Sequence, residues 1–212
     1  MNTIIDFVMR FSRWLYRFRK RCGYGIHSPF AFNLVTGVIY EDGAYYSYHR
    51  LHRMRREDNV VLREKDDKLL FRLVNNHEPA NGIILGDGLG ITVDYLKAGR
   101  HSVSWHILSC YDAVHSETLL SVLNNLSHVD FVYLDVSQDA AMLAKILMQL
   151  LPYVYNHTLI IVRDIRKNSA CAKVWHEFLS CPEVRVSMDL HDFGLLYFEK
   201  RLNKENYTIN YY

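Results

Sequence analysis

Three alternate glycines, Gly86, Gly88 and Gly90, mark the stretch of this chain best suited to binding a ligand. An apolar run at residues 83–85 precedes them, and a helical pattern that ends at Gly99 follows. Glycine allows positive φ and close approach of a ligand to the main chain, and the first turn of a helix directs free N–H groups at such a ligand. The order predicts a strand, a tight turn and a helix. It is typical of a site for a nucleotide-like ligand, and also of a turn in which glycine serves packing alone.

The elements that position this turn alternate between helix and strand. A helix is predicted at residues 65–77, before the turn, and a hairpin is predicted from strands at 184–190 and 194–198. Between them the sequence predicts strands at residues 102–108, 129–134 and 158–162 and helices at 113–126, 140–151 and 172–179. Alternation of this kind predicts an α/β fold with a doubly wound, mostly parallel sheet that closes with an antiparallel hairpin.

Two aspartates lie where predicted strands end. Asp135 follows the β-prone run 129–134, and Asp164 comes after Arg163, directly behind the most apolar strand. The ligand of a doubly wound sheet binds outside the carboxyl ends of the strands. Gly86, Asp135 and Asp164 therefore fall on one edge of the sheet, which we predict to be the functional edge.

The charge of the chain is divided unevenly along its length. Half of its 212 residues are hydrophobic, enough to bury a substantial core, and the formal net charge is only +2. The first 56 residues carry 10 Lys and Arg against 3 Asp and Glu, whereas the remainder is mildly acidic. We therefore predict a basic helical extension at residues 1–58 and one α/β domain at residues 59–212.

The predicted extension begins with an amphipathic basic helix. Apolar residues recur at helical spacing over residues 4–18, with arginines beside them. Such a helix can pack on the protein's own core, lie on an anionic membrane surface or contact nucleic acid, and the sequence does not separate the three. A second helix is predicted to begin at Ser28 and Pro29, because proline is favoured in a first helical turn. The arginines at residues 50–56 favour a solvated helix face.

Cysteine usage and hydropathy favour a cytoplasmic setting. The four cysteines are scattered with no short paired spacing, so neither a zinc site nor a disulfide framework is indicated. Asp6 and Arg10 interrupt the first apolar run and no small-residue cleavage site follows, which argues against a signal peptide. No stretch approaches membrane-spanning length.

Several segments together resemble one enzyme family. The glycine turn, the run VDFVYLD at residues 129–135, the run LIIVRDI at residues 159–165 and the closing hairpin follow the order of class I S-adenosylmethionine-dependent methyltransferases. The segments GIHSPFAF at residues 25–32 and VSMDLHDFGLLYFEK at residues 186–200 are similar to those of small bacterial O-methyltransferase-like proteins. The resemblance spans nearly the whole chain and implies a Rossmann-like fold with S-adenosylmethionine as cofactor.

This resemblance also implies roles for particular residues. The sulfonium cofactor carries the reactivity in such enzymes, and the protein aligns the methyl acceptor for attack. The acceptor is small or macromolecular, and Asp135 is expected to be the polar group nearest to it. The candidate cofactor-binding residues are Gly86, Asp87, Gly88, Gly90 and Asp112, and the candidate catalytic residues are Asp135 and Asp164.

The chain departs from the family pattern at polar positions of the cofactor site. The acid that usually ends the first strand is replaced by apolar Ile84 or Leu85. The second strand ends at residues 107–110 without a carboxylate to accept hydrogen bonds from the cofactor ribose. Each lost charge-assisted hydrogen bond weakens binding by about 1.5 to 3 kcal/mol, unless Asp87 or Asp112 supplies the acceptor.

The metal-binding acids of related O-methyltransferases are incomplete as well. Those enzymes hold a divalent cation with an acid after the fourth strand and an acidic pair after the fifth. Asp135 and Asp164 remain, but Arg163 replaces the other member of the pair, so we expect no metal site. The chain is also short between Cys110 and Val129, and one edge of the sheet is expected to be missing. The alternative to an active methyltransferase is a catalytically inactive homologue that serves as a binding or scaffold protein.

Overall fold

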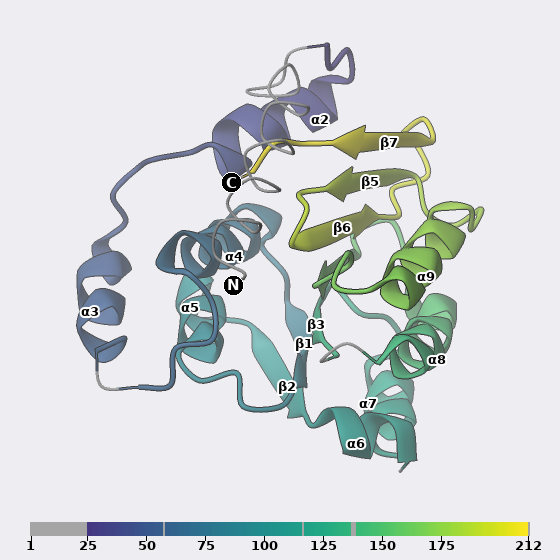
Figure 1. Cartoon of the computed structure of the whole chain (residues 1–212), viewed down its shortest axis with the longest axis horizontal. Helices are drawn as coiled ribbons and strands as arrows, with labels where there is room; N and C mark the ends of the chain where they lie inside the picture. The colour runs from purple at the N-terminus through teal and green to yellow at the C-terminus, as the bar shows by residue number, and fades with distance from the viewer. Residues whose placement is uncertain (1–24, 57, 116, 137–138, 212) are drawn as a thin grey trace, which may run out of the picture.

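The computed structural model describes residues 25–56, 58–115, 117–136 and 139–211, which form one sheet with helices on both of its faces (Figure 1). The strands are β1 (Asn81–Gly86), β2 (Ser104–Leu108), β3 (Phe131–Asp135), β4 (Leu159–Arg163), β5 (Val186–Asp189), β6 (Phe193–Tyr197) and β7 (Glu205–Thr208). Their order across the sheet is β2-β1-β3-β4-β6-β5-β7. The pairs from β2 to β4 are parallel, whereas β6 is antiparallel to both β4 and β5. The predicted α/β sheet with a closing antiparallel hairpin is confirmed.

Helices connect the strands, and one of them differs from its prediction. The described helices are α2 (Pro29–Leu34), α3 (Tyr46–Met54), α4 (Glu64–His77), α5 (Thr92–Gly99), α6 (Cys110–His115), α7 (Thr118–Leu126), α8 (Ala140–Leu150) and α9 (Ser169–Leu179), with a π-helical turn η2 (Val35–Ile39) and a 3-10 turn η3 (Leu151–Tyr153). The single helix predicted at residues 113–126 is wrong, because that segment is divided between α6 and α7. The hydroxyl of Ser109 accepts a hydrogen bond from the Asp112 N–H at 3.0 Å, which starts α6 earlier than its apolar pattern does.

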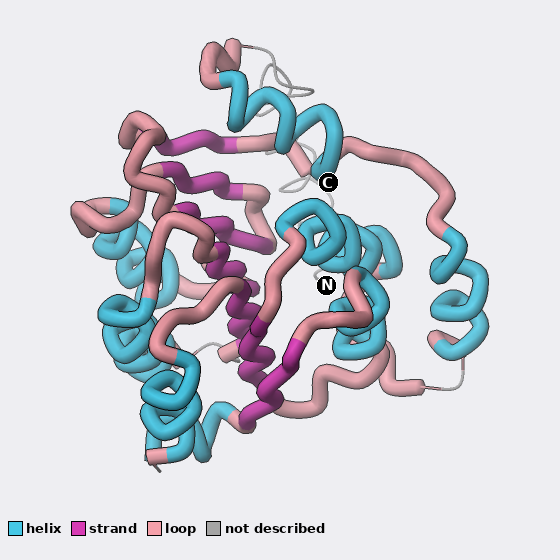
Figure 2. Tube along the Cα trace, turned by 180° about the vertical axis from the view of Figure 1, so that it is seen from behind, coloured by secondary structure: helices cyan, strands magenta, loops and turns pink. Residues whose placement is uncertain are grey.

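Helices lie on both faces of the sheet (Figure 2), and buried apolar side chains form a layer on each face. On β1, Ile83 and Leu85 pack with the layer of α6 to α9, whereas Ile84 packs with the layer of α2, η2, α4 and α5. Successive side chains of a strand point to opposite faces, and all three of these side chains are fully buried. Burial on both faces accounts for the continuous apolar run before the glycine turn.

Strand β2 forms one outer edge of the sheet. The chain between β2 and β3 forms α6 and α7, and no described strand pairs with the free side of β2. The side chain of Ile107 is 47% exposed there. The short connection between Cys110 and Val129 therefore leaves this edge open, as predicted.

Strand β7 forms the other outer edge and was not predicted. It pairs in parallel with β5, from Val186 opposite Glu205 to Asp189 opposite Thr208. The chain then continues into the core, where the hydroxyl of Tyr211 donates to the carbonyl oxygen of Lys65 at 2.8 Å. The hydroxyl of Tyr40 donates to the carbonyl oxygen of Asn210. This segment therefore joins the hairpin to helix α4 and to the region of α2 and η2.

The segment before α4 also packs on the sheet. Ser28 caps α2, and Pro29 occupies its first turn, so the predicted helix start is confirmed. Buried Arg72 of α4 donates to the carbonyl oxygens of Val38 and Ile39 at 2.7 and 3.2 Å. These hydrogen bonds satisfy carbonyl groups at the end of η2 and hold it against α4.

Helix α3 lies beside α5 and contacts the rest of the molecule through one face (Figure 1). Leu51 is fully buried there, and the rings of Tyr45 and Tyr48 pack edge-on against Phe71 of α4. The predicted helix at residues 4–18 lies outside the described residues. In the part of the chain that the structure describes, no helix is long and apolar enough to cross a membrane.

Candidate functional site

The glycine turn lies at the carboxyl end of β1, next to the end of β3. Gly86 is in register with Asp135, and a Cβ atom on Gly86 would lie 3.1 Å from Asp135 and 2.8 Å from Leu89. A Cβ atom on Gly90 would lie 2.0 Å from the carbonyl oxygen of Asn59. Packing therefore requires glycine at position 90, whether or not a ligand binds, whereas a side chain at position 86 would displace Leu89 and crowd Asp135.

Gly88 differs from the two glycines that flank it. Its φ is +63°, and nothing lies within 4 Å of the position that a Cβ atom would take. The left-handed backbone favours glycine, while the open space leaves the main chain of the exposed turn accessible. Gly88 is the point of the turn at which a ligand can reach the backbone.

A segment before α4 crosses this turn and was not predicted to belong to the site. The carbonyl oxygen of Asn59 accepts a hydrogen bond from the Ile91 N–H at 3.3 Å, and its side-chain amide donates to the Gly88 carbonyl oxygen at 3.5 Å. The N–H of Ile91, directly before α5, is therefore not free for a ligand. Asn59 lies in a stretch without apolar periodicity, and only the fold brings it over the glycines.

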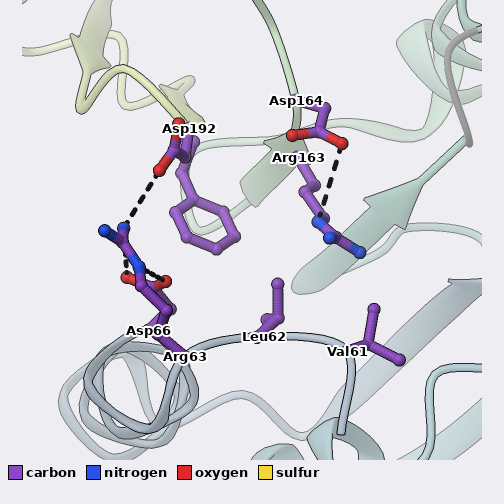
Figure 3. A pocket seen from close by; sticks show the side chains of 8 residues that line it. Val61, Leu62, Arg63, Asp66, Arg163, Asp164 and Asp192 are labelled. Atoms are coloured by element: carbon purple, nitrogen blue, oxygen red, sulfur yellow. Dashed lines mark hydrogen bonds and ion pairs between the residues drawn. The ribbon is translucent and has the colours of Figure 1, made fainter. Parts of the chain in front are cut away.

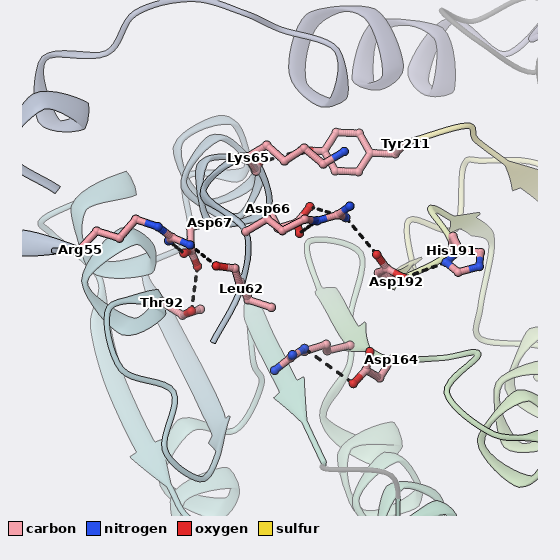
Figure 4. Close-up of polar contacts among 12 residues, drawn as sticks. Arg55, Leu62, Lys65, Asp66, Asp67, Thr92, Asp164, His191, Asp192 and Tyr211 are labelled. Atoms are coloured by element: carbon pink, nitrogen blue, oxygen red, sulfur yellow. Dashed lines mark hydrogen bonds and ion pairs between the residues drawn. The ribbon is translucent and has the colours of Figure 1, made fainter. Parts of the chain in front are cut away.

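A buried ion pair holds in place the segment around Asn59 that crosses the turn (Figure 4). Arg55, which follows α3, donates to the carboxylate of Asp67 and to the carbonyl oxygen of Leu62. Thr92 of α5 donates to the other oxygen of Asp67 at 2.8 Å. Burial raises the pKa of Asp67, and the hydrogen bonds from Thr92 and Arg55 oppose that change. The contacts join the segment to α3, α4 and α5 on either side of the turn.

Asp135 and Arg163 form an ion pair at the carboxyl edge of the sheet. Asp135 ends β3 and Arg163 ends the adjacent β4, and their side chains are 9% and 18% exposed. Burial alone would lower the pKa of Arg163, but the charge and the hydrogen bond of Asp135, together with the nearby charge of Asp164, leave that pKa raised. The candidate catalytic carboxylate of Asp135 is therefore held by a guanidinium.

Asp164 lies beside this ion pair. Its carboxylate is 3.8 Å from Nε of Arg163, and its backbone N–H donates to the carbonyl oxygen of Asp192 at 2.6 Å. Burial raises the pKa of Asp164, against the opposing charges of Arg163 and Lys167. The structure thus places Gly86, Asp135 and Asp164 along one edge of the sheet, with Arg163 in contact with both acids.

A second arginine lies across the edge from this group (Figure 3). Arg63 donates to the carboxylate of Asp66 at 2.7 and 3.1 Å and to that of Asp192 at 3.0 Å. The ring of His191 lies 2.7 Å from the other oxygen of Asp192. The sequence did not reveal this cluster, because 129 residues separate Arg63 from Asp192.

The two arginine clusters line a cavity of about 150 Å³ that is open to solvent on one side. That volume corresponds to about five water molecules and is smaller than a typical site for a whole nucleotide. Its charges could hold one small polar group through paired hydrogen bonds. The lining residues are Val61, Leu62, Arg63, Asp66, Arg163, Asp164, Asp192 and Phe193.

The remaining candidates, Asp87 and Asp112, lie at the end of the edge formed by β1 and β2. Asp87 is exposed in the glycine turn. It also faces Cys110, whose thiol donates to the Asp135 carbonyl oxygen at 3.4 Å. Burial, followed by the charge of Asp87, raises the pKa of this thiol to about 12, so Cys110 remains protonated at neutral pH. The exposed carboxylate of Asp112 accepts a hydrogen bond from Ser109 at 2.7 Å.

Among the described residues, no group of three or more His, Cys, Asp or Glu side chains is arranged to hold a metal ion. Asp135 and Asp164, at the ends of β3 and β4, contact Arg163. A guanidinium stabilises a carboxylate but offers no lone pair to a cation. Asp135 and Asp164 are thus arranged as ion-pair partners and hydrogen-bond acceptors.

Comparison with solved structures supports the fold. The SAH-bound methyltransferase PaMTH1 of Podospora anserina superposes with a TM-score of 0.51 at 10% identity, over 82% of this chain and 97% of its own. A methyltransferase from Geobacter sulfurreducens superposes with a TM-score of 0.48 at 15% identity, over 76% of this chain and 91% of its own. No protein family model matches the chain, and no curated protein matches it either. The first superposition shows that the chain has an α/β Rossmann-like methyltransferase fold, as its sequence resemblance implied.

Proposed function

We propose that this protein binds S-adenosylmethionine at the glycine turn and transfers its methyl group to a still unidentified acceptor without a metal ion. The observation that carries the proposal is Gly88, an exposed glycine with left-handed φ and open space beside it, at the carboxyl end of β1 in a methyltransferase fold. The superposed PaMTH1 is described as SAH-bound, and SAH is the demethylated form of this cofactor.

The residues around the turn fit parts of such a cofactor. Gly86, Gly88 and Gly90 allow its close approach to the backbone, and Asp87 or Asp112 supplies the acceptor for the ribose hydroxyls. Both carboxylates are exposed at the end of the edge formed by β1 and β2, where the second strand lacks an acid of its own. The bound sulfonium would supply the reactive methyl group, and the chain's part is to orient the acceptor.

The carboxyl edge supplies polar groups for the acceptor. Asp135, with Arg163 beside it, can accept a hydrogen bond from an acceptor hydroxyl or amine. Asp164 lies next to this pair and borders the small cavity. In this proposal Asp135 positions the acceptor, and Arg163 sets the charge of the site.

The second candidate is an inactive homologue that serves as a binding or scaffold protein. Two observations favour it. The carboxylate of Asp135 is tied to Arg163, and the Ile91 N–H beside the turn donates to Asn59. A methyltransferase would direct such groups at its ligands. Here both groups already have a partner within the chain.

Calorimetric titration with S-adenosylmethionine separates the two candidates. We expect a dissociation constant in the micromolar range, unchanged by magnesium, and at least a hundredfold loss on G88V because the added side chain would clash with the ligand. G37V is a matched control, since Gly37 has open space around it but no positive φ. Millimolar binding by the wild type, or equal affinity in G88V and G37V, would contradict the proposal and favour the inactive homologue.

A further inference from the structure

A groove beside α3 is lined by cations and aromatic rings, and none of its lining residues is acidic. It has a volume of about 750 Å³ and extends from the start of α3 to the turn that precedes β2. We call it the α3 groove and define it by Tyr46, His49, Arg50, Arg53 and His101. It lies outside the glycine turn and the arginine clusters described above.

The spacing of these side chains places them on one face of the helix. Tyr46, Arg50 and Arg53 are separated by four and three residues, which aligns them along about 10 Å of α3. The opposite face is fixed to the protein by the buried side chain of Leu51 and by the ring of Tyr48. The groove face is therefore held in one orientation before any partner binds.

The arginines of the groove are not neutralised. Elsewhere along this helix, His52 pairs with Glu64, and Arg55, just beyond its end, pairs with Asp67. Within the described ranges, neither Arg50 nor Arg53 forms an ion pair with a carboxylate. Like charges at neighbouring helix positions repel each other, and an anionic partner would remove that repulsion.

Two further features suit a polyanion that carries planar groups. The ring of Tyr46 is fully exposed, which makes it available for stacking. Helix α3 has no side-chain cap at its first turn, so its N–H groups and dipole add to the positive potential at the end of the groove. Arginines interleaved with an exposed aromatic ring are typical of surfaces that bind single-stranded nucleic acid.

We propose that the α3 groove binds single-stranded RNA. Arg50 and Arg53 contact successive phosphates, and a base stacks on Tyr46. Ser47 also lines the groove and offers a hydrogen-bond partner for a ribose 2′-hydroxyl, which distinguishes RNA from DNA. The groove presents arginines and a ring that ends in a hydroxyl, whereas a membrane surface is met by an apolar face. This inference does not depend on methyl transfer.

Fluorescence anisotropy with the full chain and a labelled single-stranded RNA of mixed sequence tests the proposal over a series of salt concentrations. Replacing both arginines, R50A/R53A, should weaken binding at least tenfold and reduce the slope of log K against log salt by about 1.4. Alanine favours the helix, so α3 should remain folded. The matched control, K173A/R201A, removes two positive charges from exposed positions elsewhere and should leave the affinity within about twofold.

Substitutions of Tyr46 test base stacking separately from charge, because they change RNA affinity without removing a charge. Y46A should weaken binding by about 5-fold to 100-fold without changing the salt slope, and Y46F should bind like the wild type. Equal RNA affinity in R50A/R53A and wild type would overturn the proposal. So would equal affinity for DNA of the same sequence, or loss in R50A/R53A of binding to phosphatidylserine vesicles alone.

Discussion

The arginines at the carboxyl edge and those of the α3 groove differ in their partners. Arg63 and Arg163 each contact two carboxylates, whereas within the described ranges Arg50 and Arg53 form no ion pair. The Arg163 side chain is only 18% exposed and needs an anionic partner, because an unpaired buried charge costs several kcal/mol, whereas Arg63 is 38% exposed. An exposed guanidinium is hydrated and gains little from a surface ion pair. Arg163 is therefore held by its partners for structural reasons, while the groove arginines remain available to a ligand.

The largest expected effect comes from the ion pair of Arg55 with Asp67, which is more buried than the pairs of Arg63 and Arg163. D67A leaves Arg55 without its anionic partner and should lower the free energy of unfolding by about 3 to 5 kcal/mol. R53A removes a groove arginine that forms no ion pair among the described residues, and it should change the free energy of unfolding by less than about 0.5 kcal/mol. Urea unfolding of both variants measures the difference. If D67A lowered the free energy of unfolding no more than R53A, the distinction between paired and unpaired arginines would fail.

A smaller effect is expected at Arg163, which is partly exposed. R163M keeps much of the side-chain length but removes the charge, and it should cost about 2 kcal/mol because Asp135 loses a charge-assisted hydrogen bond. R163K should recover part of that loss, since an ammonium keeps the charge without the planar geometry of the guanidinium. Thermal and urea unfolding of the two variants provide the comparison. Equal stabilities of R163M and wild type would show that this pair contributes nothing to folding.

The smallest effect is expected at Asp164 and depends on pH. Its pKa is raised in the folded protein, so its contribution to stability is complete below the unfolded pKa of about 3.9 and is lost as pH rises through the folded value. D164N should therefore be slightly more stable than wild type at pH 7, by less than about 1 kcal/mol. Asparagine also tolerates the positive φ of this position. The difference should vanish near pH 3, and a variant that is less stable than wild type at pH 7 would contradict the assignment.

The sequence predicted the helices and strands that are determined by the pattern of their own residues. Helix α4 repeats its apolar residues with helical spacing, and the runs in β1, β3 and β4 are apolar because those strands are buried on both faces. Ser28 and Pro29 identified the start of α2 for the same local reason. Because parallel strands place their carboxyl ends at one edge, the order of elements was enough to bring Asp135 and Asp164 to it.

The features that the sequence did not predict depend on distant contacts. β7 lacks an apolar alternation and forms because Glu205 to Thr208 meet the free side of β5. Asn59 and Arg63 belong to no periodic pattern, and their partners become neighbours only when the chain has folded. The roles of Gly86 and Gly90 were similarly ambiguous, because Asp135 crowds a Cβ at Gly86 and the carbonyl oxygen of Asn59 excludes one at Gly90.

The contacts of β7 and the residues that follow it have a consequence for the order of folding. The hydrogen bond between Tyr40 and Asn210 spans 170 residues, and that between Tyr211 and Lys65 spans 146. Contacts of such long sequence separation slow folding, because the entropy of closing the loop is lost before they form. During synthesis, α2 and η2 emerge before residues 205–211 and can complete their docking only after those residues have left the ribosome. Until then, their apolar surface is exposed to chaperones and to other chains.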